Sequence, residues 1–145
     1  HFAKEYVKKN HPKLVYISYG ETDDFAHGGL FDFYMKSLQN TDALIADLWS
    51  FVQNDPIYKD NTYFIITTDH GRGEGIEEGS KWTGHGSDVK GAEHTWLAIL
   101  GPDVKAIGEV SNGQLYTNQI APTVAKILNL KIDAEVMPGN PLELN

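Results

Sequence analysis

Three short apolar runs constrain the fold of this sequence more than any other feature. They occupy residues 14–19, 63–68 and 95–100 and are rich in β-branched and aromatic residues. Runs of this length and composition are typical of strands that are buried on both faces of a sheet. Segments of helical character separate them. The alternation predicts an α/β fold with a mainly parallel sheet flanked by helices.

The longest helix is predicted between the first two runs. Its stripe of residues recurs at alternating intervals of three and four: Phe31, Tyr34, Leu38, Thr41, Ile45, Leu48 and Val52. Such a stripe is typical of a helix that packs on a domain core, although a coiled coil has a similar spacing. Residues 54–56, Asn-Asp-Pro, are expected to end this helix. Shorter helices are predicted for residues 2–10 and 117–130.

The composition excludes several classes of function. The chain is 41% hydrophobic and 22% charged, as in an ordinary globular protein. No apolar run approaches the ~20 residues that a membrane-spanning helix needs. The formal net charge of −8 argues against a general nucleic-acid-binding surface. The absence of cysteine excludes thiolate metal ligands and cysteine nucleophiles within these residues.

Two Asp–His pairs follow predicted strands. Asp23 and His27 follow the first run, in a predicted loop, and a spacing of four places both on one face if the turn is helical. Asp69 and His70 follow the second run directly, and Gly71 permits a tight turn beside a ligand. Ligands of open α/β sheets collect beyond the carboxyl ends of the strands. Carboxylate and imidazole together suit zinc, and manganese less strongly. Alternatively, Asp69 caps a following turn and His70 makes one ordinary hydrogen bond.

A glycine-rich segment, residues 71–91, lacks periodicity and is predicted to be a long loop, which is commonly functional in a compact domain. His85 lies there between two glycines, which allow a ligand to approach the backbone closely. His94, just before the third run, is the alternative candidate. Four loop side chains could contact an anionic substrate or simply be solvated: Arg72, Lys81, Trp82 and Lys90.

Five motifs in this order resemble the alkaline-phosphatase superfamily, which includes nucleotide pyrophosphatases/phosphodiesterases, sulfatases and cofactor-independent phosphoglycerate mutases. They are ETDDFAHG, IITTDHG, GHGSD, LAILGP and TNQIAPTVAKIL, and they extend from about residue 13 to residue 130. The DHG motif alone is moderately specific, whereas the ordered set is highly specific. The pyrophosphatase-like and sulfatase-like members are the most similar.

The resemblance implies a centre of two divalent metal ions, zinc or alternatively manganese. Asp23, His27 and His85 would bind one ion, and Asp69 with His70 would bind part of the second. His85 is favoured over His94 by the HGSD motif and by its distance to the Gly-Pro turn at residues 101–102. The alkaline phosphatases proper instead carry a ligand in an E-H-T sequence, which residues 93–95 imitate.

The implied reaction is metal-dependent hydrolysis of small-molecule phosphate mono- or diesters. A sulfatase acting on sulfate esters is the nearest alternative. A phosphomutase ranks lower, because no large inserted substrate domain is visible in these residues. A non-catalytic domain that binds metal or another ligand would retain the same side chains, and is the alternative from a different class.

The resemblance also implies that essential parts lie elsewhere. In this superfamily the nucleophile and a further Asp ligand come early in the catalytic domain, before the motifs found here. Residues 1–145 are therefore expected to be the C-terminal portion of one catalytic domain, without a second domain and inactive alone. Thr22 and Ser87 lie near the predicted centre but match no nucleophile position. A periplasmic or extracellular location is expected, because members of this kind are often exported.

Overall fold

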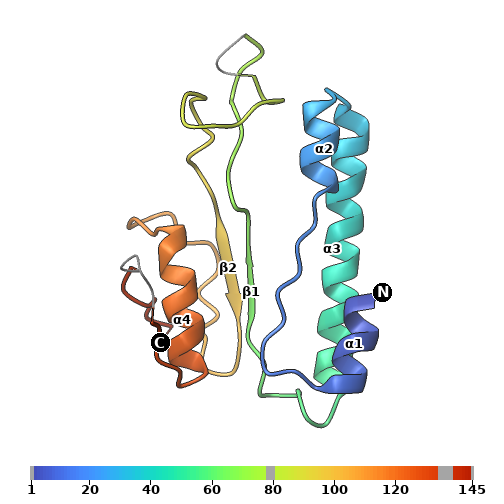
Figure 1. Cartoon of the computed structure of the whole chain (residues 1–145), viewed down its shortest axis with the longest axis vertical. Helices are drawn as coiled ribbons and strands as arrows, with labels where there is room; N and C mark the ends of the chain where they lie inside the picture. The colour runs from blue at the N-terminus through green and yellow to red at the C-terminus, as the bar shows by residue number, and fades with distance from the viewer. Residues whose placement is uncertain (1, 78–80, 134–138, 145) are drawn as a thin grey trace.

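The computed structural model describes residues 2–77, 81–133 and 139–144. Its elements in chain order are α1 (Phe2–Asn10), α2 (Glu21–His27), α3 (Phe31–Asn54), β1 (Phe64–Thr67), β2 (Leu97–Leu100), the 3₁₀ helix η1 (Thr117–Gln119) and α4 (Ile120–Ile127). Helix α3 lies on one side of the two strands and α4 on the other (Figure 1). The predicted α/β character is confirmed, whereas the arrangement of the strands differs from the prediction.

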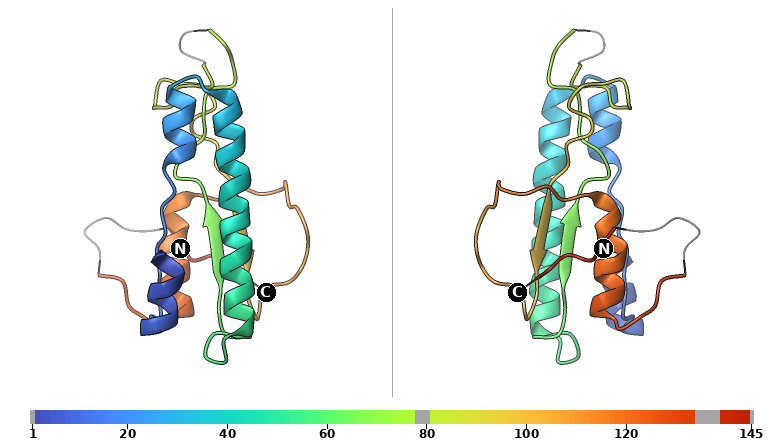
Figure 2. Two further views of the ribbon diagram at one scale, coloured as in Figure 1. Left: turned by 90° about the vertical axis from the view of Figure 1, so that its right-hand side faces the viewer. Right: turned by 90° about the vertical axis from the view of Figure 1, so that its left-hand side faces the viewer.

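The two strands are antiparallel, so the prediction of a mainly parallel sheet is wrong for the described residues. Phe64 lies opposite Leu100, and Thr67 lies opposite Leu97. Parallel neighbours need a crossover connection, usually a helix. The described residues between β1 and β2 form no helix. The chain therefore returns directly beside β1, and the two strands are seen next to each other in the right-hand view of Figure 2.

Residues 14–19 do not form the predicted strand. This segment runs as an unpaired, extended connection from α1 to α2 (Figure 1). The side chains of Leu14 and Tyr16 are 60% and 88% exposed. A strand needs a neighbour for its backbone N–H and C=O groups, and the sheet of the described residues contains only β1 and β2. The β-branched pattern indicates strand propensity but supplies no partner.

Helix α2 replaces part of the loop that was predicted after residue 19. Acidic residues in its first turn, Glu21, Asp23 and Asp24, complement the positive end of the helix dipole. Ala26 is fully buried, and α2 packs against the first half of α3. The helix thus has a packed face, and its other side chains are available for the site.

Helix α3 begins at Phe31 and ends at Asn54, as predicted, but its apolar stripe is buried only in part. Val52 is buried, whereas Phe31 and Leu38 are exposed. Trp49 contacts the strand layer, with its ring 5.1 Å from that of Phe64. The chain exposes 11053 Å², against roughly 7,400 Å² for a compact protein of this mass. The core is therefore thin.

The ends of the chain add smaller contacts. Helix α1 forms at the predicted position, and Lys4 pairs with Asp47 of α3 at 2.7 Å. Helix α4 ends three residues before the predicted boundary, and its buried residues are Pro122, Thr123 and Ala125. Within residues 2–77, 81–133 and 139–144, no helix combines the length and the apolar character needed to cross a bilayer.

Candidate metal centre

Helix α2 presents the first Asp–His pair. Asp23 and His27 lie four residues apart on one face, and His27 Nε2 is 3.4 Å from Asp23 Oδ2. Both side chains are partly exposed. The predicted placement on one helical face therefore holds, and the pair is directed toward the loops that follow β1.

The segment after β1 positions His70. Its Nδ1 lies 2.8 Å from the carbonyl oxygen of Gly71. A carbonyl only accepts, so Nδ1 carries the proton and Nε2 keeps a free lone pair. That Nε2 lies 3.8 Å from Asp23 Oδ1. The imidazole is thus held in the tautomer that can bind a cation through Nε2.

Gly71 allows this segment to pass very close to the loop. Its N–H donates to the carbonyl oxygen of Ala92 at 2.8 Å. A Cβ at this position would overlap the carbonyl oxygen of His94 and would lie 2.7 Å from that of Gly91. Only glycine fits here without a shift of the backbone. The glycine of the DHG motif therefore fixes the position of His70 relative to residues 91–94.

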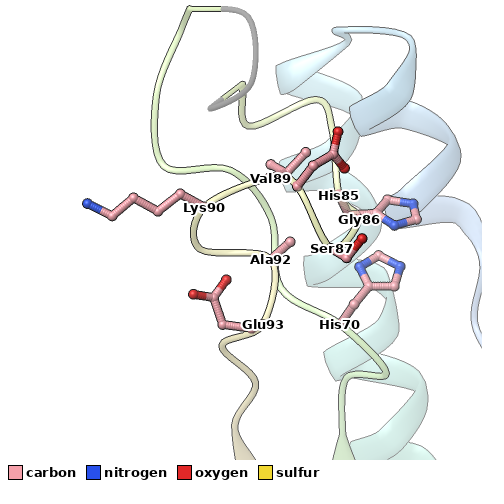
Figure 3. Close-up of a pocket in the computed structure, with 9 residues that line it drawn as sticks. His70, His85, Gly86, Ser87, Val89, Lys90, Ala92 and Glu93 are labelled. Carbon is pink, nitrogen blue, oxygen red and sulfur yellow. The ribbon is translucent and has the colours of Figure 1, made fainter.

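The glycine-rich loop brings His85 to the same place. His85 Nε2 lies 3.0 Å from His27 Nε2 and 3.5 Å from Asp23 Oδ1. Its ring stacks on that of His70 with the centroids 3.7 Å apart, and Figure 3 shows the two imidazoles side by side. Gly86 has φ of 139°, a conformation that favours glycine.

The geometry of this cluster fits a divalent cation. Asp23, His70 and His85 each offer one ligand atom, and these atoms lie within 4.8 Å of one another. Zinc binds N and O ligands at about 2.0–2.2 Å, so the ligand atoms of a tetrahedral site are about 3.3–3.6 Å apart. The separations from Asp23 to the three imidazoles run from 3.4 to 3.8 Å. His27 lies beside the group of three, with its Nε2 3.0 Å from that of His85. Small adjustments would complete such a site.

Two predicted ligands lie outside the cluster. The Asp69 side chain is 88% exposed, and its Oδ1 accepts the His70 backbone N–H at 3.1 Å. His94 is 72% exposed, and its ring nitrogens lie 3.8 Å from Glu74 and 3.9 Å from Glu93. His70 is grouped with Asp23 and His85. The division of the ligands between two ions stays a prediction.

Arg72 makes a contact in the candidate site that was not predicted. Its guanidinium contacts the carboxylate of Asp23, and its side chain is only 15% exposed. The sequence predicted a substrate contact or a solvated side chain for Arg72. It did not indicate the contact with Asp23, which lies 49 residues away in the chain. One signal was available: Arg72 is the only arginine of the sequence and comes two residues after His70.

A cavity of about 660 Å³ opens beside the histidines. It is lined by His70, His85, residues 86–90, Ala92 and Glu93. Lys90 extends away from the imidazoles (Figure 3). The backbone N–H groups of Glu93 itself and of Gly91 lower the pKa of the Glu93 carboxyl group. The cavity opens the cluster to solvent from the side of the loop.

Another of the four loop side chains that were predicted as possible substrate contacts, Trp82, packs within the structure. Trp82 packs edge-on against Phe31 and Tyr34, with centroid distances of 5.5 and 5.8 Å. These contacts hold the loop on the first turn of α3. The loop that carries His85 is therefore anchored to the helix that also supports α2.

Comparison with known proteins decides the family. The sequence profile of the metalloenzyme superfamily matches residues 2–132. The chain belongs to this superfamily. The alkaline-phosphatase-like resemblance is thereby confirmed, and with it the dependence of the family on divalent metal. No solved structure matches the chain.

Curated relatives of this metalloenzyme chain are named 2,3-bisphosphoglycerate-independent phosphoglycerate mutases. The protein from Microcystis aeruginosa is 31% identical over 89% of the chain and 24% of its own length. The corresponding values are 30%, 88% and 23% for Aliarcobacter butzleri, and 31%, 96% and 25% for Pyropia yezoensis. The chain spans about a quarter of the length of these relatives. Their names denote mutases, which the sequence analysis ranks below hydrolases.

Proposed function

We propose that this chain supplies the metal centre of an enzyme that transfers the phosphoryl group of a small phosphate ester. The observation that carries the proposal is the convergence of Asp23, His70 and His85 from three segments of the chain, with His27 beside them. The names of the relatives support a phosphate ester rather than a sulfate ester as the substrate.

The cation proposed for this cluster is zinc, with manganese as the alternative. One carboxylate and up to three imidazoles are a ligand set that both ions accept, and zinc prefers it. A second ion would be held by Asp69 together with ligands from outside these residues. When bound, divalent cations polarise phosphoryl oxygens and stabilise the charge of the leaving oxygen.

The residues of the chain then have distinct tasks. Asp23 supplies the negative charge of the site, and His70 presents Nε2 because Gly71 accepts from Nδ1. His85 closes the cluster from the loop and lines the cavity through which the ester would enter. The Gly71 backbone lies close to the carbonyl oxygens of Gly91 and His94, and this contact keeps the end of β1 and the loop at a fixed separation.

We propose water as the acceptor of the phosphoryl group, which makes the enzyme a phosphoric-ester hydrolase. The support is the GHGSD motif, which resembles that of the pyrophosphatase-like hydrolases of the superfamily. A mutase, which returns the group to another hydroxyl of the substrate, is the second candidate. The names of the relatives favour it.

The test uses the protein at its natural full length, stripped of metal and reloaded with zinc or manganese. We expect release of inorganic phosphate from a generic aryl phosphate only after reloading, and loss of that activity in His85→Ala. Isomerisation of a phosphorylated hydroxy acid without phosphate release would establish the second candidate. Turnover of an aryl sulfate alone would contradict phosphoryl transfer, as would bound metal with no turnover of any ester.

A further inference from the structure

We propose that Arg72 is a positioning residue that ties together the three segments carrying the metal ligands. This inference rests on the proposed metal centre. The segments are α2 with Asp23, residues 68–73 after β1 with His70, and residues 81–92 of the loop with His85. Arg72 belongs to the second segment and reaches side-chain and main-chain acceptors of the other two.

The contacts of the guanidinium define this role. Arg72 Nη2 contacts Asp23 Oδ1 and also donates to the main-chain oxygen of Asp23 at 3.3 Å. Nη1 donates to the carbonyl oxygen of Trp82 at 3.5 Å. The side chain is 15% exposed. A largely buried guanidinium with acceptors on two other segments is a fixed part of the site.

Backbone hydrogen bonds from Gly71 to Ala92 and from Gly73 to Gly84 already join the second and third segments, so the main task of Arg72 is to connect α2 to them. Helix α2 packs on α3, and β1 pairs with β2, so each half of the site belongs to a different layer of the fold. Arg72 contacts Asp23 at Oδ1, the oxygen that also faces His70 and His85, while Oδ2 faces His27. The carboxylate is therefore held through one oxygen. A partner of this kind orients a ligand before the cation arrives, which strengthens binding.

The chemistry requires arginine rather than any cation. Guanidinium presents five N–H donors in a rigid planar fork, so two of its nitrogens can serve acceptors on separate segments. The single nitrogen of a lysine cannot be near both Asp23 and Trp82 in the same way. All the other basic residues of the chain apart from histidine are lysines. The bridge therefore depends on Arg72 alone.

Zinc titration of the full chain by calorimetry tests this role. We expect Arg72→Ala and Arg72→Lys to weaken zinc binding by about 10- to 100-fold, as the loss of outer partners of metal ligands does. Lys4→Ala, which removes a cation paired with Asp47 far from the site, is the matched control and should bind as the parent does. Unchanged or tighter binding in Arg72→Ala would overturn the proposal. Full affinity in Arg72→Lys would show that charge alone suffices and would overturn the bridge.

Hydrogen exchange in the metal-free chain provides a readout that does not depend on metal. We expect faster exchange in α2 and in residues 81–85 of both Arg72 variants, with α1 and the last turns of α3 unchanged. A parent chain that binds no zinc would contradict the proposed metal centre. Equal exchange in parent and variants would contradict the positioning role itself, whatever the metal result.

Discussion

The two Asp–His pairs of the molecule are alike in sequence and different in structure. Asp23 is surrounded by Arg72, His27, His70 and His85, with its carboxylate in the middle of the cluster. The Asp69 carboxylate is 88% exposed, and within the described part of the chain its polar contacts are with His70. The same two residue types thus form an organised centre in one place and a solvent-facing pair in the other.

This difference shows which contacts hold an aspartate carboxylate in a position suited to binding a metal. Asp23 lies on a helix that packs against α3, and an arginine from another segment holds its carboxylate. Asp69 follows a strand directly and accepts from the next backbone N–H, which is a local contact. Convergence of separate segments, rather than the Asp–His pattern, organises the first pair.

The largest expected effect comes from removing the central carboxylate. Asp23→Asn keeps the shape of the side chain but loses the charge and leaves the Arg72 guanidinium without its anionic partner. We expect zinc affinity to fall by more than about 100-fold, measured by calorimetry. A greater loss in Asp69→Asn than in Asp23→Asn would reverse the comparison.

A second experiment separates the two histidines of the loop region. His85 lies within the cluster, whereas His94 is 72% exposed and faces two glutamates. We expect His85→Ala to weaken zinc binding by about 10- to 100-fold and His94→Ala to leave it within about twofold. The opposite order would assign the ligand to the E-H-T sequence instead.

A third experiment tests the close approach at the end of β1. Gly71→Ala forces a Cβ against the carbonyl oxygens of His94 and Gly91. We expect a loss of about 1–3 kcal/mol in the free energy of unfolding, measured by urea denaturation. Gly20→Ala is the control, since nothing lies within 4 Å of its Cβ and its φ of −101° suits alanine. Equal stability of the two variants would contradict the packing described at Gly71.

The smallest effect is expected at the second pair. Asp69→Asn removes a charge that lies mostly in solvent, so the affinity for the first equivalent of zinc should change by less than about threefold. Titration of the variant beside the parent measures this. A loss as large as that in Asp23→Asn would place Asp69 in the first site.

Local patterns in the sequence predicted α1, α3 and α4 well, but they missed helix α2 and the pairing of the strands. The boundaries of α3 follow from its three-four spacing and the Asn-Asp-Pro that ends it, because both signals lie within the element. Residues 14–19 have the composition of a strand, but pairing depends on a neighbour that composition does not reveal. The antiparallel direction of β2 follows from a connection without a helix.

The part of the candidate site that could be predicted is the part where glycines allow two backbone segments to lie close together. Gly71 and the glycines beside His85 indicated that backbone and ligand groups meet, and the structure brings His70 and His85 together. The contact of Arg72 with Asp23 joins residues 49 positions apart. No periodicity or spacing encodes such a contact. The grouping of His70 with Asp23 likewise depends on how α2 lies against the strand end.

Anomalous diffraction from crystals of the chain grown with zinc tests the central claim most directly. The account predicts a peak at the zinc edge among Asp23, His27, His70 and His85, at about 2.0–2.2 Å from at least three of their ligand atoms. A peak beside Glu74, Glu93 and His94 with none at Asp23, or no ordered zinc at all, would contradict it.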